Sequence, residues 1–395
     1  MSEDDFLGSL YQRFPVTVER GEGTRVWDTS GREYIDCMGG YGVALVGHRN
    51  PRVVAAIKSQ VDKIITVHTS LYNKTREEFL ERLIKVSPKG LTNVHLGNSG
   101  AEAVEAAIKF ARKYTGKSGM IAMNGSYHGK SMGALSVTFN PKYRKSFMPL
   151  VDKVSFSPFG DADALREKID EDTAFVIMEP IQGEGGINVA PDGFLQEVRR
   201  ICDEKGILLI FDEIQAGLGR TGKMWACDHW NTTPDIMCLA KGIAGGVPMS
   251  ATLVKPEILA AMSKGEHSST FGGNPLSCAA GIATLQALTE DGLVSNAEKV
   301  GKVFREGLER LKEKHSVVRQ IRGKGLMIGV EMKFEVKDIL FDAISEGVLL
   351  LYSGRNILRL LPPLVITEND VAKVLEVLDR LFVREAERKS VQGQN

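Results

Sequence analysis

Lys241 and Asp212 carry the pattern that most favours covalent chemistry in this chain. Lys241 follows an apolar run, 236–240, and opens a glycine-rich turn that reaches Gly246. Asp212 lies 29 residues earlier and ends a second apolar run, 207–211. A lysine amine forms an imine with an aldehyde, and a carboxylate beside a pyridine nitrogen keeps that nitrogen protonated. Either residue alone could be a solvated charge at a strand end, but the pair predicts a site for pyridoxal phosphate.

The elements that position these residues follow from an alternation of apolar runs and amphipathic stretches. The runs that predict buried strands are 94–97, 120–123, 173–178, 207–211, 236–240 and 251–254. A helix is predicted over 194–205, where apolar residues recur at helical spacing and Gly206 marks the end. Strand, helix and strand in this order predict an α/β fold with a mostly parallel sheet. Because ligands bind at the carboxyl ends of such strands, Glu179, Asp212 and Lys241 should share one crevice.

The segment around Ser99, Gly100 and Ala101 predicts an anion site. Ser99 and Glu102 have the spacing of a capping box, and apolar residues at helical spacing follow them. A helix that begins here offers free backbone N–H groups and the positive end of its dipole, and Gly100 allows a phosphate to approach closely. The alternative is an ordinary capped helix, and the nearby lysine chemistry favours the phosphate.

Composition excludes several classes of protein. The 395 residues are 43% hydrophobic and 25% charged, as expected for a globular protein of two or three domain-sized units. Fifty basic and fifty acidic residues balance, so neither nucleic acid nor a membrane surface is an expected partner. Five cysteines without a CxxC pair, and an N-terminus without an apolar signal core, predict a cytoplasmic protein.

Other motifs give no support to rival chemistry. The glycines of 323–329 resemble a dinucleotide-binding loop, but the third is one residue late and a strand-like run follows, so a tight turn is expected. The sequence contains no P-loop, and its seven histidines lack metal-ligand spacing. We therefore expect no metal centre and assign the histidines structural or supporting positions.

A set of motifs distributed along the chain resembles the class III aminotransferases of fold type I. These motifs are 98–103 (Asn-Ser-Gly-Ala-Glu-Ala), 126–129 (Ser-Tyr-His-Gly), 179–185 (Glu-Pro-Ile-Gln-Gly-Glu-Gly), 212–215 (Asp-Glu-Ile-Gln), 219–223 (Gly-Arg-Thr-Gly-Lys), 241–242 (Lys-Gly) and 269–275 (Ser-Thr-Phe-Gly-Gly-Asn-Pro). The resemblance extends from about residue 26 to 366. It is strongest to acetylornithine aminotransferases and to archaeal enzymes that act on carrier-protein-linked aminoadipate or glutamate semialdehyde.

The resemblance implies an architecture and a set of cofactor contacts. It implies a large pyridoxal phosphate-binding domain, 45–295, with a mostly parallel seven-stranded sheet, and a small α+β domain formed by 1–44 and 296–395. Lys241 would hold the cofactor, Asp212 would pair with its pyridine nitrogen and Gln215 would bond its ring hydroxyl. The other implied contacts are Ser99, Gly100 and Ala101 to the phosphate, Tyr127 stacked on the ring, and Thr270 to the phosphate of a neighbouring subunit. The functional unit would then be a homodimer.

The resemblance also implies how two substrates share one site. Glutamate enters by its α-amine and the second substrate by a distal amine, so the carboxylate-binding group must be maskable. In related enzymes a glutamate matching Glu184 pairs with an arginine matching Arg359 and releases it for glutamate. Lys130 and Ser269 match further substrate-binding positions. The implied reaction moves an amino group between glutamate and an ω-semialdehyde in a two-stage, ping-pong cycle of lysine or arginine synthesis, with N-acetylornithine or amines linked to a small acidic carrier protein as leading partners.

Three positions depart from the family pattern. Lys130 stands where an arginine usually grips a substrate carboxylate, and lysine keeps the charge but loses the bidentate fork. Ala101 replaces a threonine and Ser268 a glycine. We therefore expect altered carboxylate binding and altered phosphate contacts.

Several alternatives stay open at this stage. Within the family they are a 4-aminobutyrate aminotransferase, an ornithine aminotransferase and a semialdehyde aminomutase. Outside it they are a nicotinamide-dependent oxidoreductase and a non-catalytic binding module.

Overall fold

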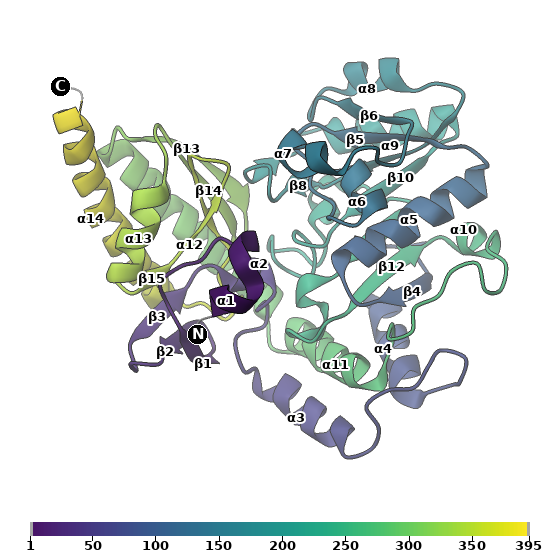
Figure 1. The fold of residues 1–395 in the computed structure, drawn as a ribbon, viewed down its shortest axis with the longest axis horizontal. Coiled ribbons are helices and arrows are strands. Elements are labelled where there is room, and N and C mark those ends of the chain that lie inside the picture. Colours follow the sequence, from purple (N-terminus) through teal and green to yellow (C-terminus); the bar gives the residue numbers. More distant parts are fainter. Residues whose placement is uncertain (1–2, 393–395) are drawn as a thin grey trace.

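The computed structural model describes residues 3–392. Figure 1 shows one large lobe built on a wide sheet and a smaller lobe beside it that holds both ends of the chain. Among the described residues, no helix is both long enough and apolar enough to cross a membrane.

A seven-stranded sheet forms the centre of the large lobe. Its strands, in spatial order, are β4 (Asn93–Gly97), β12 (Ser250–Val254), β11 (Ile236–Leu239), β10 (Leu208–Asp212), β7 (Thr173–Met178), β5 (Gly119–Met123) and β6 (Val154–Ser157). Pairing is parallel from β11 to β6, and β12 is antiparallel to both of its neighbours. The prediction of a mostly parallel sheet is confirmed. All six predicted strands are present, and the edge strand β6 is an addition.

Two long helices cover opposite faces of this sheet. Helix α5 (Gly100–Thr115) packs its apolar stripe on one face, where Ile210 of β10 is buried. Helix α9 (Phe194–Lys205) packs on the other face, where Leu209 and Phe211 are buried. Alternate residues of one strand therefore enter two cores, which explains why the strands are continuous apolar runs in the sequence. The predicted helix 194–205 is confirmed, with Gly206 as its left-handed cap.

The large lobe has further helices outside these two. They are α3 (Pro51–Val61), α4 (Lys74–Val86), α6 (Met132–Ser136), α7 (Pro141–Arg144), α8 (Ala162–Lys168), α10 (Pro256–Ala260) and α11 (Pro275–Glu290). The short α2 (Gly39–Gly42) comes earlier in the chain and lies on the side of the smaller lobe in Figure 1. Helix α11 packs against α3 and α4 at the bottom of the view in Figure 1.

The smaller lobe joins the two ends of the chain. Its first sheet is β1 (Val18–Glu22), β2 (Arg25–Asp28), β3 (Glu33–Asp36) and β15 (Val348–Leu349), and its second is β13 (Val318–Lys324), β14 (Met327–Met332), β17 (Ile357–Leu360) and β16 (Leu351–Ser353). Its main helices are α12 (Leu293–Lys314), α13 (Lys337–Ser345) and α14 (Glu368–Gln392), and a short α1 (Glu3–Leu7) starts the chain. Because β3 pairs with β15, N-terminal and C-terminal residues share one sheet. The domain limits at residues 45 and 295 stay a prediction.

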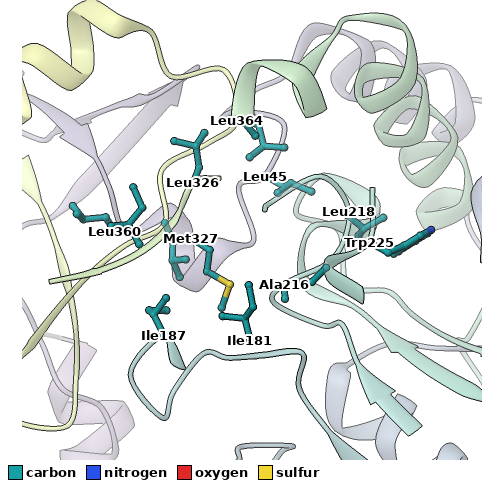
Figure 2. Close-up of a cluster of buried hydrophobic side chains, with 14 of the residues drawn as sticks. Leu45, Ile181, Ile187, Ala216, Leu218, Trp225, Leu326, Met327, Leu360 and Leu364 are labelled. Atoms are coloured by element: carbon teal, nitrogen blue, oxygen red, sulfur yellow. The ribbon is translucent and has the colours of Figure 1, made fainter. Parts of the chain in front are cut away.

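The glycine-rich segment near Gly325 is a hairpin. Strands β13 and β14 pair in antiparallel fashion on either side of it, and Gly325 has a φ of 52° in the turn. A dinucleotide loop would lead from a strand into a helix, so the predicted tight turn is confirmed. Figure 2 shows that Met327, from this hairpin, faces Ile181 and Ile187, while Leu326 lies on the side of Leu45 and Leu364 in the same buried cluster. That cluster fixes the small lobe against the edge of the large sheet where the strands end.

Candidate active site

Three strand ends deliver ionisable side chains to one cavity. Asp212 is the last residue of β10, Glu179 directly follows β7, and Lys241 comes two residues after β11. These strands are parallel neighbours, so their carboxyl ends lie at the same edge of the sheet. Glu179, Asp212 and Lys241 line a single cavity of about 420 Å³.

Lys241 occupies a strained position that directs its amine. Its φ is 47°, in the left-handed region that costs a non-glycine residue about 1–2 kcal/mol. It begins a short 3-10 turn, Lys241–Ala244, that ends in Gly245, also left-handed. Burial lowers the pKa of the Lys241 amine, and the carboxylates of Glu184 and Asp212 oppose that shift. A lowered pKa leaves more of the amine neutral and nucleophilic near neutral pH.

Asp212 is held as an oriented carboxylate. One oxygen, Oδ2, accepts from His128 Nδ1 at 2.7 Å, and the other, Oδ1, accepts from the backbone N–H of Ile214 at 3.0 Å. Both side chains are buried, and His128 Nε2 has no hydrogen-bond partner among the described residues. The two bonds fix the plane of the carboxylate at the cavity wall, where it can accept from a cationic ring nitrogen.

Glu179 ties the loop of Tyr127 to the sheet. Its oxygens accept from the backbone N–H of Tyr127 at 3.2 Å and of Gly183 at 2.9 Å. Burial raises the pKa of Glu179, and nearby Asp212 adds to that shift while His128 opposes it. Burial also raises the pKa of Tyr127 to about 12, with Glu184 as the next cause. Tyr127 therefore stays a neutral aromatic wall of the cavity.

The start of α5 forms the anion-binding part of the cavity. Ser99 Oγ accepts from the backbone N–H of Glu102 at 3.3 Å, which confirms the first arm of the predicted capping box. The second bond of a capping box would run from the backbone N–H of Ser99 to the Glu102 carboxylate. Glu102 accepts instead from the backbone N–H of Asn98 at 2.9 Å, so this part of the prediction is wrong by one residue. A Cβ at Gly100 would lie 2.9 Å from Ile214 Cδ1 and would push that side chain aside, so glycine keeps this end of the helix open. Ser99, Gly100 and Ala101 all line the cavity.

A buried arginine lies beside the cavity and pairs with a carboxylate. Arg359 Nη1 donates to Glu184 Oε1 at 2.6 Å and to Gln215 Oε1 at 3.5 Å. The Arg359 side chain is 0% exposed and Glu184 is 25% exposed. Arg359 Nε and Nη2 have no hydrogen-bond partner among the described residues, and the guanidinium lies 5.5 Å from the centre of the Tyr41 ring. The guanidinium keeps donors free for a further carboxylate.

The structure separates the predicted residues into those at the cavity and those near it. The predicted residues that line the cavity are Ser99, Gly100, Ala101, Tyr127, Lys130, Glu184, Asp212, Gln215 and Lys241. Ser269 does not line the cavity, but its Oγ accepts at 3.1 Å from Nδ2 of Asn98, which does. Thr270 is exposed and does not line the cavity.

Other residues that line the cavity were absent from the sequence-based set of binding residues. Those whose contacts are described above are Asn98, His128, Glu179 and Ile214. Glu179 was placed at the crevice by its strand end, and the other three lie inside motifs already quoted. The signal that would have found them is adjacency to Ser99, Tyr127 and Asp212 in the sequence.

The residues present fit pyridoxal phosphate. An open helix start faces the cavity where a Cβ would collide with Ile214, which suits a phosphate. A carboxylate held by two hydrogen bonds and a buried amine line the same cavity, which suits a protonated pyridine ring with an aldehyde.

Residues 8–382 match the family model described as aminotransferase class-III. The chain therefore belongs to the class III aminotransferases, which are pyridoxal phosphate-dependent transferases of fold type I.

Similar proteins in this family carry more specific names. The acetylornithine aminotransferase of Methanopyrus kandleri is 46% identical over 96% of this chain and 97% of its own length. The [LysW]-aminoadipate semialdehyde transaminase of Deinococcus radiodurans is 46% identical over 96% of this chain and 89% of its own length. Among solved structures, the ornithine aminotransferase from Toxoplasma gondii ME49 has a TM-score of 0.92 at 32% identity, covering 98% of this chain and 94% of that one.

Replacing Gly100 with alanine is expected to weaken cofactor binding by about tenfold. The new methyl group would push Ile214 Cδ1 from 2.9 Å into the cavity, an overpacking worth about 1–3 kcal/mol. Absorbance titration of the apoenzyme with pyridoxal phosphate measures the change. Adding Ile214→Ala should restore affinity by making room; an unchanged dissociation constant in the single variant would contradict the fit.

Proposed function

We propose that this transaminase exchanges an amino group between glutamate or 2-oxoglutarate and an ω-amine or semialdehyde substrate of lysine or arginine biosynthesis. The second substrate is N-acetylornithine, or lysine or ornithine linked through its α-amine to a small acidic carrier protein. In all of these the α-amine is acylated, so only the distal amine can react.

The observation that carries this proposal is the pair formed by Glu184 and Arg359. Arg359 is buried with two nitrogens that have no partner among the described residues, so a carboxylate that displaces Glu184 would gain a bidentate partner. Glu184 is one-quarter exposed and can turn toward water at low cost. For a substrate that presents a distal amine, Glu184 stays in place and neutralises the arginine. One site can therefore accept glutamate and an uncharged ω-carbon chain in turn.

The cofactor contacts follow the cavity wall. Lys241 supplies the amine that holds the cofactor, and Asp212 and Gln215 bond its ring. Ser99, Gly100 and Ala101 would hold the phosphate, and Tyr127 would cover the ring. When bound, pyridoxal phosphate supplies a conjugated electron sink for the electron pair left on the substrate carbon. Lys241 Nζ would remove and return the proton at that carbon.

Two cations belong to this region: Lys130 lines the cavity, and Arg359 is buried beside it. Lys130 Nζ lies 5.0 Å from the centre of the Tyr143 ring, and Arg359 lies near Tyr41. Lys130 provides a second, single-point contact for a carboxylate, in place of the fork that an arginine would offer. This suits a substrate whose far end is held by an acyl group or a carrier protein more than by its own carboxylate.

The working unit of this proposal is a homodimer in the cytoplasm. Arg76 donates to the carbonyls of Val67, Leu71 and Gly273 at 2.6–2.9 Å, which joins two surface segments into one. These segments expose large apolar side chains: Leu71 is 65% and Phe271 64% exposed. Apolar area of this kind suits a protein interface, and it lies next to Thr270, which would serve the neighbouring site. The five cysteines are buried and unpaired, as a reducing compartment favours.

A substrate comparison tests the proposal. Turnover with 2-oxoglutarate is measured for N-acetylornithine, carrier-linked lysine, carrier-linked ornithine, free ornithine and 4-aminobutyrate. We expect one of the acylated amines to exceed both free amines by about 100-fold in kcat/KM, because each interaction that only the acyl group can make is worth about 1–3 kcal/mol. A preference for carrier-linked amines assigns the enzyme to a carrier-dependent pathway, and a preference for N-acetylornithine to conventional arginine synthesis. Faster turnover of ornithine or 4-aminobutyrate would contradict the proposal.

A further inference from the structure

Residues 263–272 form a surface loop that runs beside α5. The loop carries Ser269 and Thr270. At the start of α5 it is attached through Asn98, whose Nδ2 donates to Ser269 Oγ at 3.1 Å. Its position therefore depends on the same helix that opens toward the cavity.

A second attachment lies about three turns further along α5. Lys109 Nζ donates to the backbone carbonyl of Glu266 at 3.0 Å and to Nδ1 of His267 at 2.9 Å. One turn later, Lys113 Nζ makes an ion pair with Glu266 Oε1 at 2.9 Å. The His267 ring also packs on His95 of β4 at 4.5 Å and against the Phe110 ring at 5.5 Å.

The bond between Lys109 and His267 requires one protonation state. An ammonium group only donates, so Nδ1 of His267 must be the unprotonated nitrogen of a neutral ring. Protonation of Nδ1 would place two donors and two positive charges face to face. The other charged or titratable groups that face His267 are Glu102 and Glu105 of α5, His95 of β4 and Glu266 on the loop itself. The carboxylates offset part of the repulsion, whereas His95 adds to it once protonated.

We propose that Lys109 and His267 are positioning residues whose hydrogen bond, made only while His267 is neutral, holds the 263–272 loop against α5 and releases it in acid. The proposal rests on the proposed function in one respect: the loop matters for catalysis because Thr270 would complete the cofactor site of a neighbouring subunit.

The pH window follows from the sign of the shifts. Burial lowers the pKa of His267 from its ordinary 6.5, and Lys109 adds to that shift. Burial also lowers the pKa of His95, to about 4, with His267 and Lys109 as further causes. A histidine with a depressed pKa in the ordered state favours order above its ordinary pKa. Ordering of the loop is therefore complete above about pH 6.5 and decreases as the pH falls below that value.

Hydrogen exchange in the apoenzyme tests the proposal without reference to catalysis. Exchange of amides in 263–272 is measured at pH 7.5 and pH 5 and corrected for the intrinsic rate at each pH. Lys109→Ala removes both bonds of Lys109 to the loop and should raise exchange at pH 7.5 by at least about threefold to tenfold, the effect expected from the loss of one hydrogen bond alone. His267→Gln keeps an acceptor that does not titrate, so the difference between pH 7.5 and pH 5 should shrink. Lys113→Ala is the matched control, because it removes an ion pair whose side chains are 46% and 36% exposed and leaves His267 in place.

Two results would overturn the proposal. One is a Lys109→Ala variant that exchanges no faster than Lys113→Ala, and the other is a His267→Gln variant with the full pH response of the parent protein. A second readout, the rate of pyridoxal phosphate loss on dilution at pH 5, separates this proposal from the proposed dimeric site. If the variants change loop exchange but not cofactor loss, the hydrogen bond stands and the role given to Thr270 fails.

Discussion

Replacing Lys241 with alanine is expected to lower transamination by at least about 10⁴-fold. In the proposed function the amine is the covalent attachment point and the group that moves the substrate proton, so both roles disappear together. The purified variant should also lose the visible absorbance of the lysine-linked cofactor, even when pyridoxal phosphate is present in excess. Single-turnover absorbance with glutamate measures the rate of the first half-reaction directly.

The control is Lys223→Ala, which removes an exposed lysine outside the cavity. It should match the parent protein in rate and absorbance. Thermal unfolding of Lys241→Ala should show unchanged or slightly raised stability, because alanine removes a buried amine although the left-handed φ of 47° stays unfavourable. A folded Lys241→Ala variant that keeps more than about one-hundredth of the parent rate would exclude Lys241 as the catalytic base.

Much of the cavity wall could be predicted because strand ends are visible in the sequence. Asp212 and Lys241 each close an uninterrupted apolar run, and a run of that kind signals a strand buried on both faces. Parallel strands then bring such ends to one edge of the sheet, so the nearness of Glu179, Asp212 and Lys241 required no knowledge of the tertiary contacts. The start of α5 could be predicted equally well, since a capping serine and a glycine mark it.

The features of the site that could not be predicted from the sequence depend on contacts between segments that lie far apart in the chain. The bond between His128 and Asp212 joins residues 84 apart, and a scattered histidine gives no periodic signal. The loop carrying Thr270 is placed by Asn98 and Lys109, more than 150 residues away, through polar contacts that leave no hydrophobic pattern. Strand β6 was missed because Val154–Ser157 alternates polar and apolar residues over only four positions at the edge of the sheet.

Replacing Arg359 with alanine is expected to impair the two half-reactions unequally. For glutamate, kcat/KM should fall by about 10²–10³-fold, since truncating one partner of a buried charge-assisted pair costs about 2–5 kcal/mol. For the ω-amine substrate the decrease should stay below about threefold, because Glu184 and not the substrate is the partner of Arg359 in that half-reaction. Single-turnover absorbance of each half-reaction separates the two values. Arg359→Lys should fall in between, because lysine keeps the charge but loses the fork.

Two further variants test whether the unequal loss in the two half-reactions comes from the contact between Arg359 and the carboxylate of the glutamate substrate. Arg199→Ala removes an arginine of α9 that bonds Asp235 at 2.8 Å and lies outside the cavity, so it controls for the loss of an interior cation without loss of the carboxylate interaction. Glu184→Gln removes the charge that masks Arg359, and should therefore strengthen binding of dicarboxylates while slowing the ω-amine half-reaction.

Equal losses in both half-reactions of Arg359→Ala, with Glu184→Gln unchanged, would mean that Arg359 only supports the wall of the cavity. The observed geometry argues against that outcome, because Arg359 is paired with Glu184, a partly exposed carboxylate that lines the cavity and can turn away from it.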